Sequence, residues 1–437
     1  MNVDVLEQPL DNHRVVIIGG GFGGLYAARA LRRSAASVTL IDRRNFHLFQ
    51  PLLYQVATGG LSPANIAAPL RGLLRRQRQT SVLLAEVVDF DVANREVVLA
   101  DGKVAYDSLI VAAGSEFNYF GHDEWRALAP GLKTIEDATT IRARVLTAFE
   151  EAERISDQPA RREWLTFVIV GGGATGVELA GALAEIARNT LRHDFRSINS
   201  AEASILLVEG RDRLLEAFAP DLSEHTAGTL EKLGVTIYTR ATVTDVRPHE
   251  VVIKKNECAE TIPARTILWT AGVRASPLAQ KLAAASGAET DRMGRIVVGA
   301  DLTIAGHPDI FVVGDMAHFA HGAGGPLPGV APVAMQQGRY AAQVIEARAA
   351  GKPPPGPFRY HDRGNMAVIG RSAAVADLRG RHIWGFPAWF VWLFIHLLYL
   401  AQFQNRLLVV IQWAWNYFTR NRSARLITGS TSAATAE

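Results

Sequence analysis

Two stretches of the chain repeat one pattern of hydrophobic, small and polar positions. Each begins with a short β-branched run, continues into a glycine cluster and ends in a run rich in Ala and Leu. The two stretches are RVVIIGGGFGGLYAARAL, from Arg14, and TFVIVGGGATGVELAGAL, from Thr166. The apolar run is typical of a buried strand, and the Ala- and Leu-rich run is typical of a helix. The pattern predicts two strand–turn–helix units, and a composition with 38 glycines and 48% hydrophobic residues fits an α/β protein.

Each unit holds the spacing G-x-G-x-x-G between its predicted strand and its predicted helix. The first glycine lets the strand turn sharply, the second lets the backbone approach a pyrophosphate, and the third lets the helix pack closely on the strand. The helix N-terminus then directs unpaired N–H groups at the phosphates. One such motif carries little weight, but two in the same context indicate two dinucleotide sites. The motif glycines are Gly19, Gly21 and Gly24 in the first unit and Gly171, Gly173 and Gly176 in the second.

An acidic residue follows each motif at the end of the next predicted strand. Asp42 comes 18 residues after the last motif glycine of the first unit, and Glu209 comes 33 residues after that of the second. A carboxylate here accepts hydrogen bonds from a ribose and repels a 2′-phosphate, which favours NADH over NADPH. Arg211 and Arg213 lie close by and weaken that preference. The longer second spacing predicts a lengthened helix and a loop, and a solvated loop acid is the alternative for Glu209.

Charge and cysteine content narrow the class of protein. The formal net charge of +3 gives no argument for a nucleic-acid partner. The single cysteine, Cys258, lies in the polar segment KKNECAE, which predicts a hairpin or a loop. One cysteine excludes an intrachain disulfide and a cysteine-based metal site, and it favours a reducing, cytosolic compartment; no other ligand cluster with metal-site spacing is apparent. The first residues, MNVDVLEQPLDNHR, carry acids and no long apolar run, which predicts a loose extension rather than a signal peptide.

Two dinucleotide units in one chain imply two nucleotides, and a tightly held FAD with a transient NADH is the common arrangement. The motifs quoted above resemble those of the two-dinucleotide-binding-domain flavoproteins. Disulfide-handling and sulfide-oxidising members need redox cysteines, which this chain lacks. From about residue 14 to 428 the chain resembles the type II, non-proton-pumping NADH:quinone oxidoreductases. The segments that carry this resemblance are NFHLFQPLLYQVATGGLSP from Asn45, GGGATGVELAGALAEIARNTLRHDFR from Gly171, APVAMQQGRYAA from Ala331 and YHDRGNMAVIGRSAAVAD from Tyr360.

The resemblance assigns further residues to the two nucleotides. SLIVAAGS (108–115) and TILWTAGVR (266–274) resemble the two crossings between the domains, and HPDIFVVGDMAHF (307–319) resembles the late FAD motif. In that motif the aspartate, here Asp315, binds the ribityl–pyrophosphate region of FAD; a strand-end cap is the alternative. The residues so assigned are Ala113, Gly114, Gly314 and Asp315 for FAD, and Gly272 and Glu178 for NADH.

The quinone side is also assigned by resemblance. In the family a glutamine often follows the alanine that opens the APVAMQQGRYAA segment, and it lines the quinone tunnel; this chain has proline there, which offers no side-chain donor and no N–H. A later glutamine of the segment is expected to supply the polar contact, and two residues of the flavin loop are expected to touch the isoalloxazine edge. The residues concerned are Ala331, Pro332, Gln336 and Gln337, and Gln50 and Pro51.

Glu178 is the leading candidate for a catalytic carboxylate, because quinone reduction needs two protons. The resemblance places it at the nicotinamide, where it would help to handle the nicotinamide or the protons. The alternative is that Glu178 caps the first turn of its helix, where acidic residues are favoured in any case. His47 lies in the flavin loop. A packed histidine explains it at least as well as a proton donor does.

The C-terminal region carries two apolar, aromatic runs separated by the polar segment QFQNR. The first, residues 384–401, has His396 as its one side chain that ionises near neutral pH and reaches the lower length limit of a membrane span. Five of the eight tryptophans fall in these runs, and arginines follow them, a combination typical of helices that lie in the membrane interface. We therefore expect residues 384–425 to lie on an anionic membrane surface. A buried core or dimer contact and a transmembrane helix are the alternatives.

Together these features predict an α/β protein with two Rossmann-like dinucleotide-binding domains and a helical, membrane-binding C-terminal segment. The expected FAD domain comprises 11–120 and 290–350, the NADH domain 121–289 and the membrane-associated domain 351–437. The expected enzyme passes a hydride from NADH to non-covalent FAD and two electrons to a membrane quinone without pumping protons. It is expected at the cytoplasmic face of the plasma membrane, and the resemblance implies a homodimer. The alternatives are a soluble flavin reductase for an iron–sulfur protein and a non-catalytic redox sensor.

Overall fold

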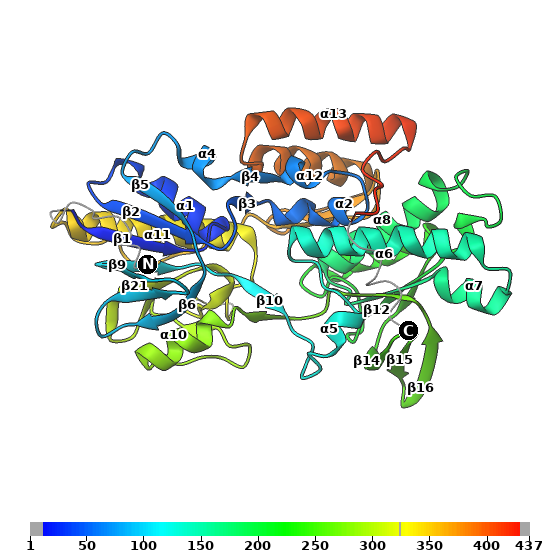
Figure 1. Ribbon diagram of the computed structural model, residues 1–437, viewed down its shortest axis with the longest axis horizontal. Coiled ribbons are helices and arrows are strands. Elements are labelled where there is room, and N and C mark those ends of the chain that lie inside the picture. The colour runs from blue at the N-terminus through cyan, green and yellow to red at the C-terminus, as the bar shows by residue number, and fades with distance from the viewer. Residues whose placement is uncertain (1–11, 323–324, 429–437) are drawn as a thin grey trace. The chain divides into compact units, whose positions relative to one another are not determined.

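A computed structural model of the chain describes residues 12–322 and 325–428 (Figure 1). The predicted N-terminal extension and the outer ends of the first and last predicted domains lie outside these residues. The chain divides into two compact units, and each is built from separated segments. Unit 1 comprises residues up to Leu48, Ala67–Glu116 and Val273–Asp362, and unit 2 comprises Phe49–Ile66, Phe117–Gly272 and the residues from Arg363 onward.

A six-stranded sheet forms the centre of unit 1. All neighbouring strands in it are parallel except the outermost pair, β20 and β21, which is antiparallel. Ile17 of the predicted first strand pairs with Leu40 on one side and with Ile110 on the other, so this strand is buried in the middle of the sheet. The strands, in sheet order, are Thr303–Ile304 (β20), His307–Val312 (β21), Ser108–Val111 (β9), Arg14–Ile18 (β1), Ser37–Asp42 (β2) and Thr80–Leu84 (β5).

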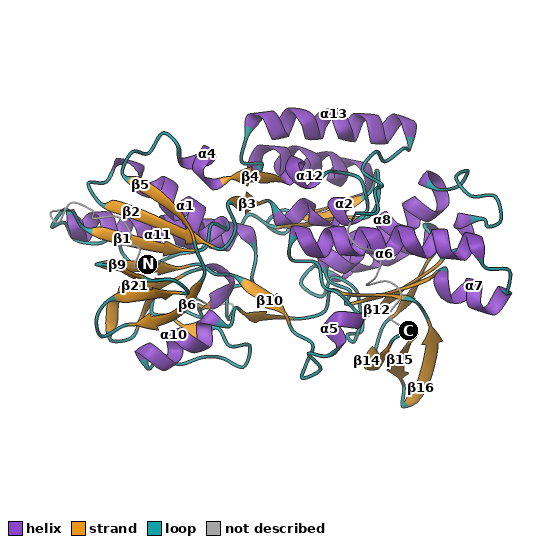
Figure 2. Ribbon diagram, in the orientation of Figure 1, coloured by secondary structure: helices purple, strands orange, loops and turns teal. Residues whose placement is uncertain are grey.

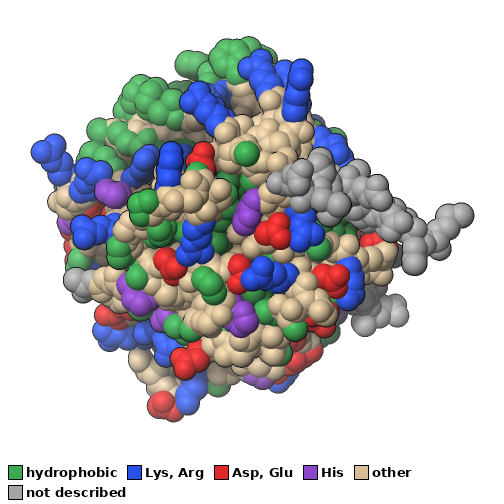
Figure 3. All heavy atoms as spheres, turned by 90° about the vertical axis from the view of Figure 1, so that its left-hand side faces the viewer, with side chains coloured by type: hydrophobic (Ala, Val, Ile, Leu, Met, Phe, Trp, Pro, Cys, Tyr) green, Lys and Arg blue, Asp and Glu red, His purple; other side chains and the backbone are tan. Residues whose placement is uncertain are grey.

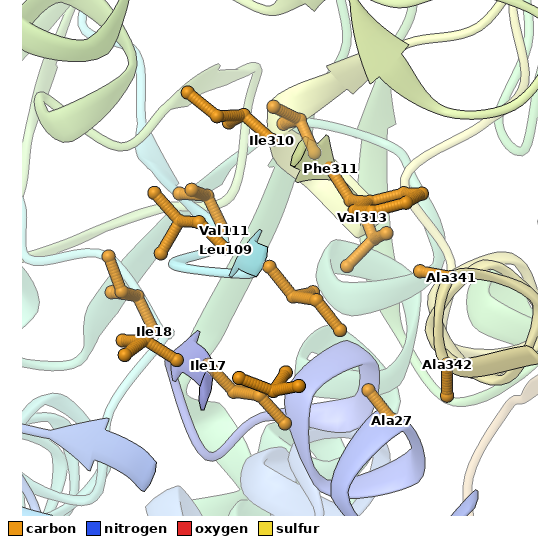
Figure 4. Close-up of a cluster of buried hydrophobic side chains, with 14 of the residues drawn as sticks. Ile17, Ile18, Ala27, Leu109, Val111, Ile310, Phe311, Val313, Ala341 and Ala342 are labelled. Atoms are coloured by element: carbon orange, nitrogen blue, oxygen red, sulfur yellow. The ribbon is translucent and has the colours of Figure 1, made fainter. Parts of the chain in front are cut away.

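Two helices cover this sheet and complete the core of unit 1. They are α1 (Phe22–Ala30), which follows the first glycine motif, and α11 (Ala331–Ala349). Figure 4 shows apolar side chains of β1, β9 and β21 pointing toward small residues of these helices, including Ala27 and Ala341. The helices approach so closely that a Cβ on Gly338 of α11 would lie 2.2 Å from the carbonyl oxygen of Gly23. The predicted strand–turn–helix unit is therefore confirmed here.

Smaller elements complete unit 1, and Figure 2 shows them as short strands and helices. An antiparallel three-stranded sheet is formed by β6, β7 and β8, and the short pairs are β3 with β4 and β19 with β22. Their bounds are Leu31–Arg33 (η1), Phe46–Leu48 (β3), Ala67–Pro69 (β4), Leu70–Leu74 (α4), Val87–Asp91 (β6), Glu96–Leu99 (β7), Lys103–Ala105 (β8), Ser115–Phe117 (β10, whose last residue belongs to unit 2), Val273–Ala275 (β18), Leu278–Ser286 (α10), Ile296–Val297 (β19), Gly314–Met316 (η5) and Ala317–His318 (β22).

A four-stranded parallel sheet forms the centre of unit 2. Its strands, in sheet order, are Val235–Tyr238 (β13), Ser204–Val208 (β12), Thr166–Val170 (β11) and Thr266–Trp269 (β17). The predicted second strand–turn–helix unit is confirmed by β11 and α8 (Ala174–Glu185). A π-helical turn, Ile186–Thr190 (η3), and a loop follow α8 before β12 begins. This lengthened connection accounts for the long spacing to Glu209.

The remaining elements of unit 2 include two antiparallel three-stranded sheets, β14–β15–β16 and β23–β24–β25. Cys258 is exposed and free at the turn of the β15–β16 hairpin, as its polar surroundings predict. The bounds are Gln50–Leu52 (η2), Leu53–Ala57 (α2), Pro63–Ile66 (α3), Trp125–Leu128 (α5), Ile135–Arg154 (α6), Gln158–Trp164 (α7), Ser200–Glu202 (η4), Pro220–Lys232 (α9), Ala241–Arg247 (β14), Glu250–Lys255 (β15), Cys258–Pro263 (β16), Asn365–Val368 (β23), Ala374–Asp377 (β24) and His382–Trp384 (β25).

Two helices end unit 2, namely α12 (Gly385–Tyr399) and α13 (Phe403–Thr419). The buried face of α12, which includes Trp392 and His396, packs toward β24, and a short turn at residues 400–402 separates it from α13. Within the described residues, no helix has the length and apolar character needed to cross a membrane.

The expected domain bounds and the two compact units coincide in part. The chain passes between the units after Glu116 and after Gly272, at the two predicted crossings. Other bounds differ: residues 273–289 belong to unit 1, residues 49–66 and 117–120 belong to unit 2, and the expected C-terminal domain is divided between unit 1 (351–362) and unit 2 (from 363). The flavin-loop segment 49–66 belongs to unit 2 because α2 packs against α6 and α8, and α3 packs against α13, contacts between distant segments that no local pattern reveals.

Candidate active site

The first glycine turn is closed on two sides and open on the third. Gly19 has φ +97°, and a Cβ there would lie 2.4 Å from the carbonyl oxygen of Ala112. A Cβ on Gly24 would lie 1.8 Å from the carbonyl oxygen of Gly19, which prevents any larger residue at that position. A Cβ on Gly21 would meet no atom within 4 Å. The open space at this second glycine is where the motif requires a pyrophosphate to approach the backbone.

The second glycine turn repeats this geometry. Gly171 has φ +109°, and its Cβ would lie 2.6 Å from the backbone nitrogen of Ala271, while a Cβ on Gly176 would lie 1.8 Å from the carbonyl oxygen of Gly171. Gly173, like its counterpart, faces open space within 4 Å. Gly272, also expected at this site, has φ +66° and is closed by Phe120, whose ring carbon would lie 2.6 Å from an added Cβ.

The two strand-end acids are fixed to the glycine turns in the same way. Asp42 accepts a hydrogen bond from Gly20 N at 2.6 Å and another from Arg44 N at 2.7 Å. Glu209 accepts one from Gly172 N at 2.5 Å and another from Arg211 N at 2.7 Å. Each carboxylate keeps lone pairs that could accept from further donors such as ribose hydroxyls. Glu209 is therefore an ordered part of the second turn rather than a solvated loop acid.

The arginines beside Glu209 are held differently from each other. Arg213 donates to the carbonyl oxygens of Phe218 and Glu216, both at 2.9 Å, and to Ser223 Oγ at 3.2 Å. The guanidinium of Arg211 is exposed and lies 3.5 Å from Glu216. Because the Arg213 guanidinium is occupied by the backbone, Arg211 is the one of the two that stays available to a 2′-phosphate.

The residues expected at the late FAD motif lie together in unit 1. Ser115 Oγ donates to Asp315 Oδ2 at 2.5 Å, which links the first residue of β10 to the η5 turn. Gly314 has φ +71° and Gly114 has φ +73°, and a Cβ on Gly114 would meet open space. Ala113, between β9 and this glycine, packs against the unit 1 core. The geometry brings these residues to the same sheet edge as the first glycine turn, since β9 and β1 are neighbours.

The glutamines expected on the quinone side are both engaged with the backbone. Gln337 is 1% exposed, and its Oε1 accepts from Gly314 N at 2.7 Å. Gln336 donates to the carbonyl oxygen of His361 and accepts from the His361 nitrogen, each at 3.0 Å. Pro332 lies in the first turn of α11, directly after Ala331, where a helix leaves its N–H groups unpaired and proline costs nothing.

The flavin-loop residues are also held in place. Gln50 Nε2 donates to the carbonyl oxygen of Lys133 at 3.1 Å, and Pro51 starts the η2 turn. His47 is buried, its Nδ1 lies 2.9 Å from the carbonyl oxygen of Gly20, and burial lowers its pKa to about 4. His47 is therefore a neutral, packed histidine that supports the first glycine turn, which was one of the two readings of the sequence.

Glu178 lies one turn further along its helix than the sequence suggested. Because α8 begins at Ala174, Glu178 is in the second turn, and the first turn holds no acidic residue. The expectation of a first-turn position was wrong by one turn, since Gly173 ends the turn and caps the helix. Desolvation raises the pKa of the half-buried Glu178 to about 8, opposed by a long contact of 3.5 Å from Val368 N. A carboxyl group with this pKa is mostly protonated at neutral pH.

Comparison with known proteins agrees with this geometry. A sequence model of the pyridine nucleotide-disulphide oxidoreductase family matches residues 13–338, and one of the NDH2 C-terminal domain matches residues 362–421. The type II NADH:quinone oxidoreductases Ndh and NdhA of Mycobacterium tuberculosis are 44% and 45% identical to the chain, over 96% and 95% of it and 91% and 89% of their own lengths. The chain belongs to the type II NADH:quinone oxidoreductases.

Solved structures show the same fold. NDH2 from Plasmodium falciparum, solved in complex with NADH, superimposes with a TM-score of 0.86 at 21% identity, covering 96% of this chain and all of the other. A sulfide:quinone oxidoreductase from Aquifex aeolicus superimposes with a TM-score of 0.70 at 17% identity, covering 96% of this chain and 94% of the other. As a type II NADH:quinone oxidoreductase, the chain binds FAD and uses NADH as its substrate.

A cluster of buried and half-buried polar residues in unit 2 was missed by the sequence reasoning. The hydroxyl of Tyr54, on α2, accepts from Gln55 Nε2 at 2.8 Å, and Gln55 Oε1 accepts from Trp413 Nε1 at 2.7 Å. Next to them, Arg422 pairs with Glu185 at 3.0 Å, both nearly buried. Gln55 and Trp413 are 358 positions apart, so no local pattern signals their contact. The Tyr-Gln pair within the recognised flavin-loop segment was the one signal available.

Proposed function

We propose that this type II NADH:quinone oxidoreductase works at a lipid surface, where it oxidises NADH at a bound FAD and reduces a quinone held in the bilayer. The observation that carries this proposal is that one chain has two features. It has two open glycine turns, each with its own strand-end acid, and it has an exposed apolar surface on its last two helices. Two dinucleotides fit the turns, and a lipid-soluble acceptor accounts for the surface.

The chain's own residues bind, orient and supply protons. The two glycine turns receive the pyrophosphates, and we assign Asp42 and Asp315 to FAD and Glu209 to the adenosine ribose of NADH. The redox chemistry would be supplied by bound FAD, through which two electrons would pass from NADH to the quinone. Glu178, protonated at neutral pH, is assigned as a proton donor during quinone reduction, since its raised pKa matches such a role.

The apolar surface lies along one face of each C-terminal helix. Side chains spaced by four residues on α12 and α13 are exposed, while Ala388, Trp392 and His396 on the other face of α12 are buried. Figure 3 shows hydrophobic side chains gathered along the upper edge, the level at which Figure 1 draws α13. The exposed residues, between 43% and 82% exposed, are Phe386, Phe390, Phe394 and Leu398 of α12 and Phe403, Leu407, Leu408, Val410, Ile411, Trp415 and Phe418 of α13. Exposed apolar surface of this extent favours insertion into the head-group region of a bilayer.

Some residues expected at that surface are turned inward. Trp392 is 2% exposed and His396 is 9% exposed, so neither contributes to the apolar surface. Arg422 and Arg425 are engaged with Glu185 and Asp194, which leaves Arg420, at the end of α13, as an exposed cation for anionic lipid. The surface is therefore mainly apolar, and we expect lipid charge to add less than the aromatic side chains do.

The alternative of a soluble reductase for an iron–sulfur protein is disfavoured by this surface, because a soluble partner would need a polar docking face. The full-length chain can be assayed with a long-chain quinone held in vesicles and with a short-chain, water-soluble quinone. Phe418→Asp, which alters a side chain 82% exposed, is expected to lower vesicle binding and turnover of the long-chain quinone at least about tenfold and to leave the short-chain reaction unchanged.

The control for that experiment is Cys258→Asp, which adds the same charge at an exposed position of unit 2 outside α12 and α13. It should change neither reaction. Equal vesicle binding by the wild type and Phe418→Asp would contradict the proposed docking surface.

Two further parts of the proposal concern location and assembly. We place the enzyme on the cytoplasmic face of the membrane, in keeping with a chain that holds a single, free cysteine. Protease added outside intact cells is expected to leave the enzyme uncut, and the same protease is expected to cut it after the cells are lysed. The implied homodimer is tested by the molar mass of the detergent-solubilised enzyme.

A further inference from the structure

A run of hydrogen bonds joins α13 to α2 in unit 2 and fixes the direction of each bond. The indole of Trp413 can only donate, so the group of Gln55 that faces it, 2.7 Å away, must be the carbonyl oxygen. The amide nitrogen of Gln55 therefore faces the Tyr54 hydroxyl, 2.8 Å away, and donates to it. Because an amide NH₂ cannot accept, the hydroxyl hydrogen of Tyr54 must point to a different partner.

No acceptor for this hydrogen is found among residues 12–322 and 325–428. Tyr54 is 7% exposed, so water does not readily replace the missing acceptor. A buried donor without an acceptor costs about 1–3 kcal/mol. The Tyr54 hydroxyl is therefore a donor whose hydrogen bond would be made by an acceptor from outside the described chain.

A second buried donor lies beside this run. The Trp392 ring packs against Trp413 with centroids 5.4 Å apart, and its Nε1 has no hydrogen-bond partner among the described residues. Buried polar atoms are nearly always paired in folded proteins, so these two donors, which are linked through Trp413 and Gln55, indicate a missing acceptor. A ligand whose polar atoms are all acceptors and whose body is flat and apolar matches such surroundings.

The acid assigned to proton donation is close to the same hydroxyl. Tyr54 and Glu178 interact electrostatically, together with Glu185 and Arg422, although Tyr54 and Glu178 form no direct hydrogen bond. The hydroxyl donor is therefore near the carboxyl group that the proposed function assigns to proton donation. A quinone carbonyl oxygen has two lone pairs and no proton, so it can accept the hydrogen bond that the Tyr54 hydroxyl leaves unmade.

Resting on the quinone reductase function proposed above, we propose that the Tyr54 hydroxyl donates a hydrogen bond to a carbonyl oxygen of the quinone, and that Gln55 and Trp413 are positioning residues that keep its hydrogen directed there. Tyr54 retains its proton throughout, so it orients the head group and stabilises charge that develops on the oxygen during reduction. Through Trp413, on the lipid-docking helix α13, the orientation of this donor depends on the docking helix being in place.

The direction of the hydrogen bond provides the test. Tyr54→Phe removes the donor. Gln55→Glu leaves the hydroxyl in place but reverses the bond, because a carboxylate accepts from Trp413 with one oxygen and from Tyr54 with the other. Gln55→Met keeps the length of the side chain and leaves the Tyr54 hydrogen free. We expect KM for quinone to rise about tenfold in Tyr54→Phe and in Gln55→Glu, and about twofold in Gln55→Met.

Each variant is assayed as the FAD-loaded enzyme, with flavin content and reduction by NADH as measures of folding and of the other half-reaction. Both are expected to match the wild type. If Gln55→Met is as damaging as Gln55→Glu, or if Tyr54→Phe has wild-type kinetics with quinone, the assignment of Tyr54 is overturned. Failure of every quinone to reoxidise the wild type would instead overturn the proposed function itself, so the two failures are distinguishable.

Discussion

Replacing Glu178 by glutamine tests the proton donor assigned to quinone reduction. Glutamine keeps the size of the side chain and its contact with Val368 N but carries no exchangeable acidic proton. General acid catalysis contributes about 10²–10⁴-fold to proton-transfer steps, so quinone-dependent reoxidation is expected to slow by at least about a hundredfold at pH 7. Hydride transfer from NADH needs no proton, and its rate is expected to stay close to that of the wild type.

The pKa of Glu178 sets how strongly the rate of quinone reduction should depend on pH. With the pKa of Glu178 raised to about 8 by desolvation, the wild-type acid is protonated below that pH and loses its proton above it. Between pH 7 and pH 9 the protonated fraction falls about tenfold, and the rate of quinone reduction should fall with it. In Glu178→Gln this decline is expected to disappear, leaving a low rate that does not change across the same range.

Stability provides the internal control. The folded-state pKa of Glu178, about 8, lies above its ordinary value of 4.5, so the cost of burying the group is absent below pH 4.5 and grows until pH 8. At pH 7 the cost amounts to about 3 kcal/mol, from about 1.4 kcal/mol per pH unit. Glu178→Gln should therefore be more heat-stable than the wild type at pH 7 and equally stable near pH 4.5.

The assay is rapid mixing of the NADH-reduced enzyme with a quinone at a series of pH values, followed by flavin absorbance. A Glu178→Gln variant with wild-type reoxidation rates, or with the same decline between pH 7 and pH 9, would refute the role of this carboxyl group. A variant that is less stable than the wild type at pH 7 would show that Glu178 is not buried as a neutral acid.

Three further predictions concern the nucleotide turns and the buried ion pair. Gly176→Ala is expected to abolish folding of unit 2, which circular dichroism would show, because the added Cβ would lie 1.8 Å from a backbone oxygen. Gly173→Ala should fold, because its Cβ meets open space, and should raise KM for NADH about tenfold in steady-state kinetics. Glu209→Ala should raise kcat/KM for NADPH about tenfold or more, and an unchanged NADPH/NADH ratio would contradict its role. Arg422→Met should lower the free energy of unfolding by about 3–5 kcal/mol in urea titrations, and the additional change Glu185→Leu should restore most of it; no restoration would show that the ion pair is not the cause.

The nucleotide turns are predictable from the sequence because their requirements are local. The glycine spacing dictates a backbone that only glycine allows at Gly24 and Gly176, and the acids Asp42 and Glu209 follow at the end of the next strand in each unit. The long spacing between Gly176 and Glu209 is explained by the lengthened helix and the loop between them, which the sequence also predicts. The position of Glu178 within its helix was misjudged by one turn, since helix starts depend on how far the glycine turn extends.

The acceptor side is not predictable in the same way because its residues come from distant segments. Gln336 and Gln337 look alike in the sequence, yet Gln336 is half-buried and hydrogen-bonds to the backbone of His361, while Gln337 is buried and accepts from Gly314 N. The alternation of exposed and buried faces on α12 follows from its packing on β24, and an apolar run without polar positions gives no hint of which face is inward. The contact of Gln55 with Trp413 likewise exists only in the folded chain.

One measurement tests the central claim most directly. The purified, FAD-loaded enzyme is mixed with NADH without oxygen until the flavin absorbance bleaches, and vesicles that contain a quinone are then added. The account predicts rapid recovery of the oxidised flavin spectrum, faster with quinone-loaded vesicles than with empty ones. Bleaching by NADH with no faster recovery for any quinone tried would contradict it.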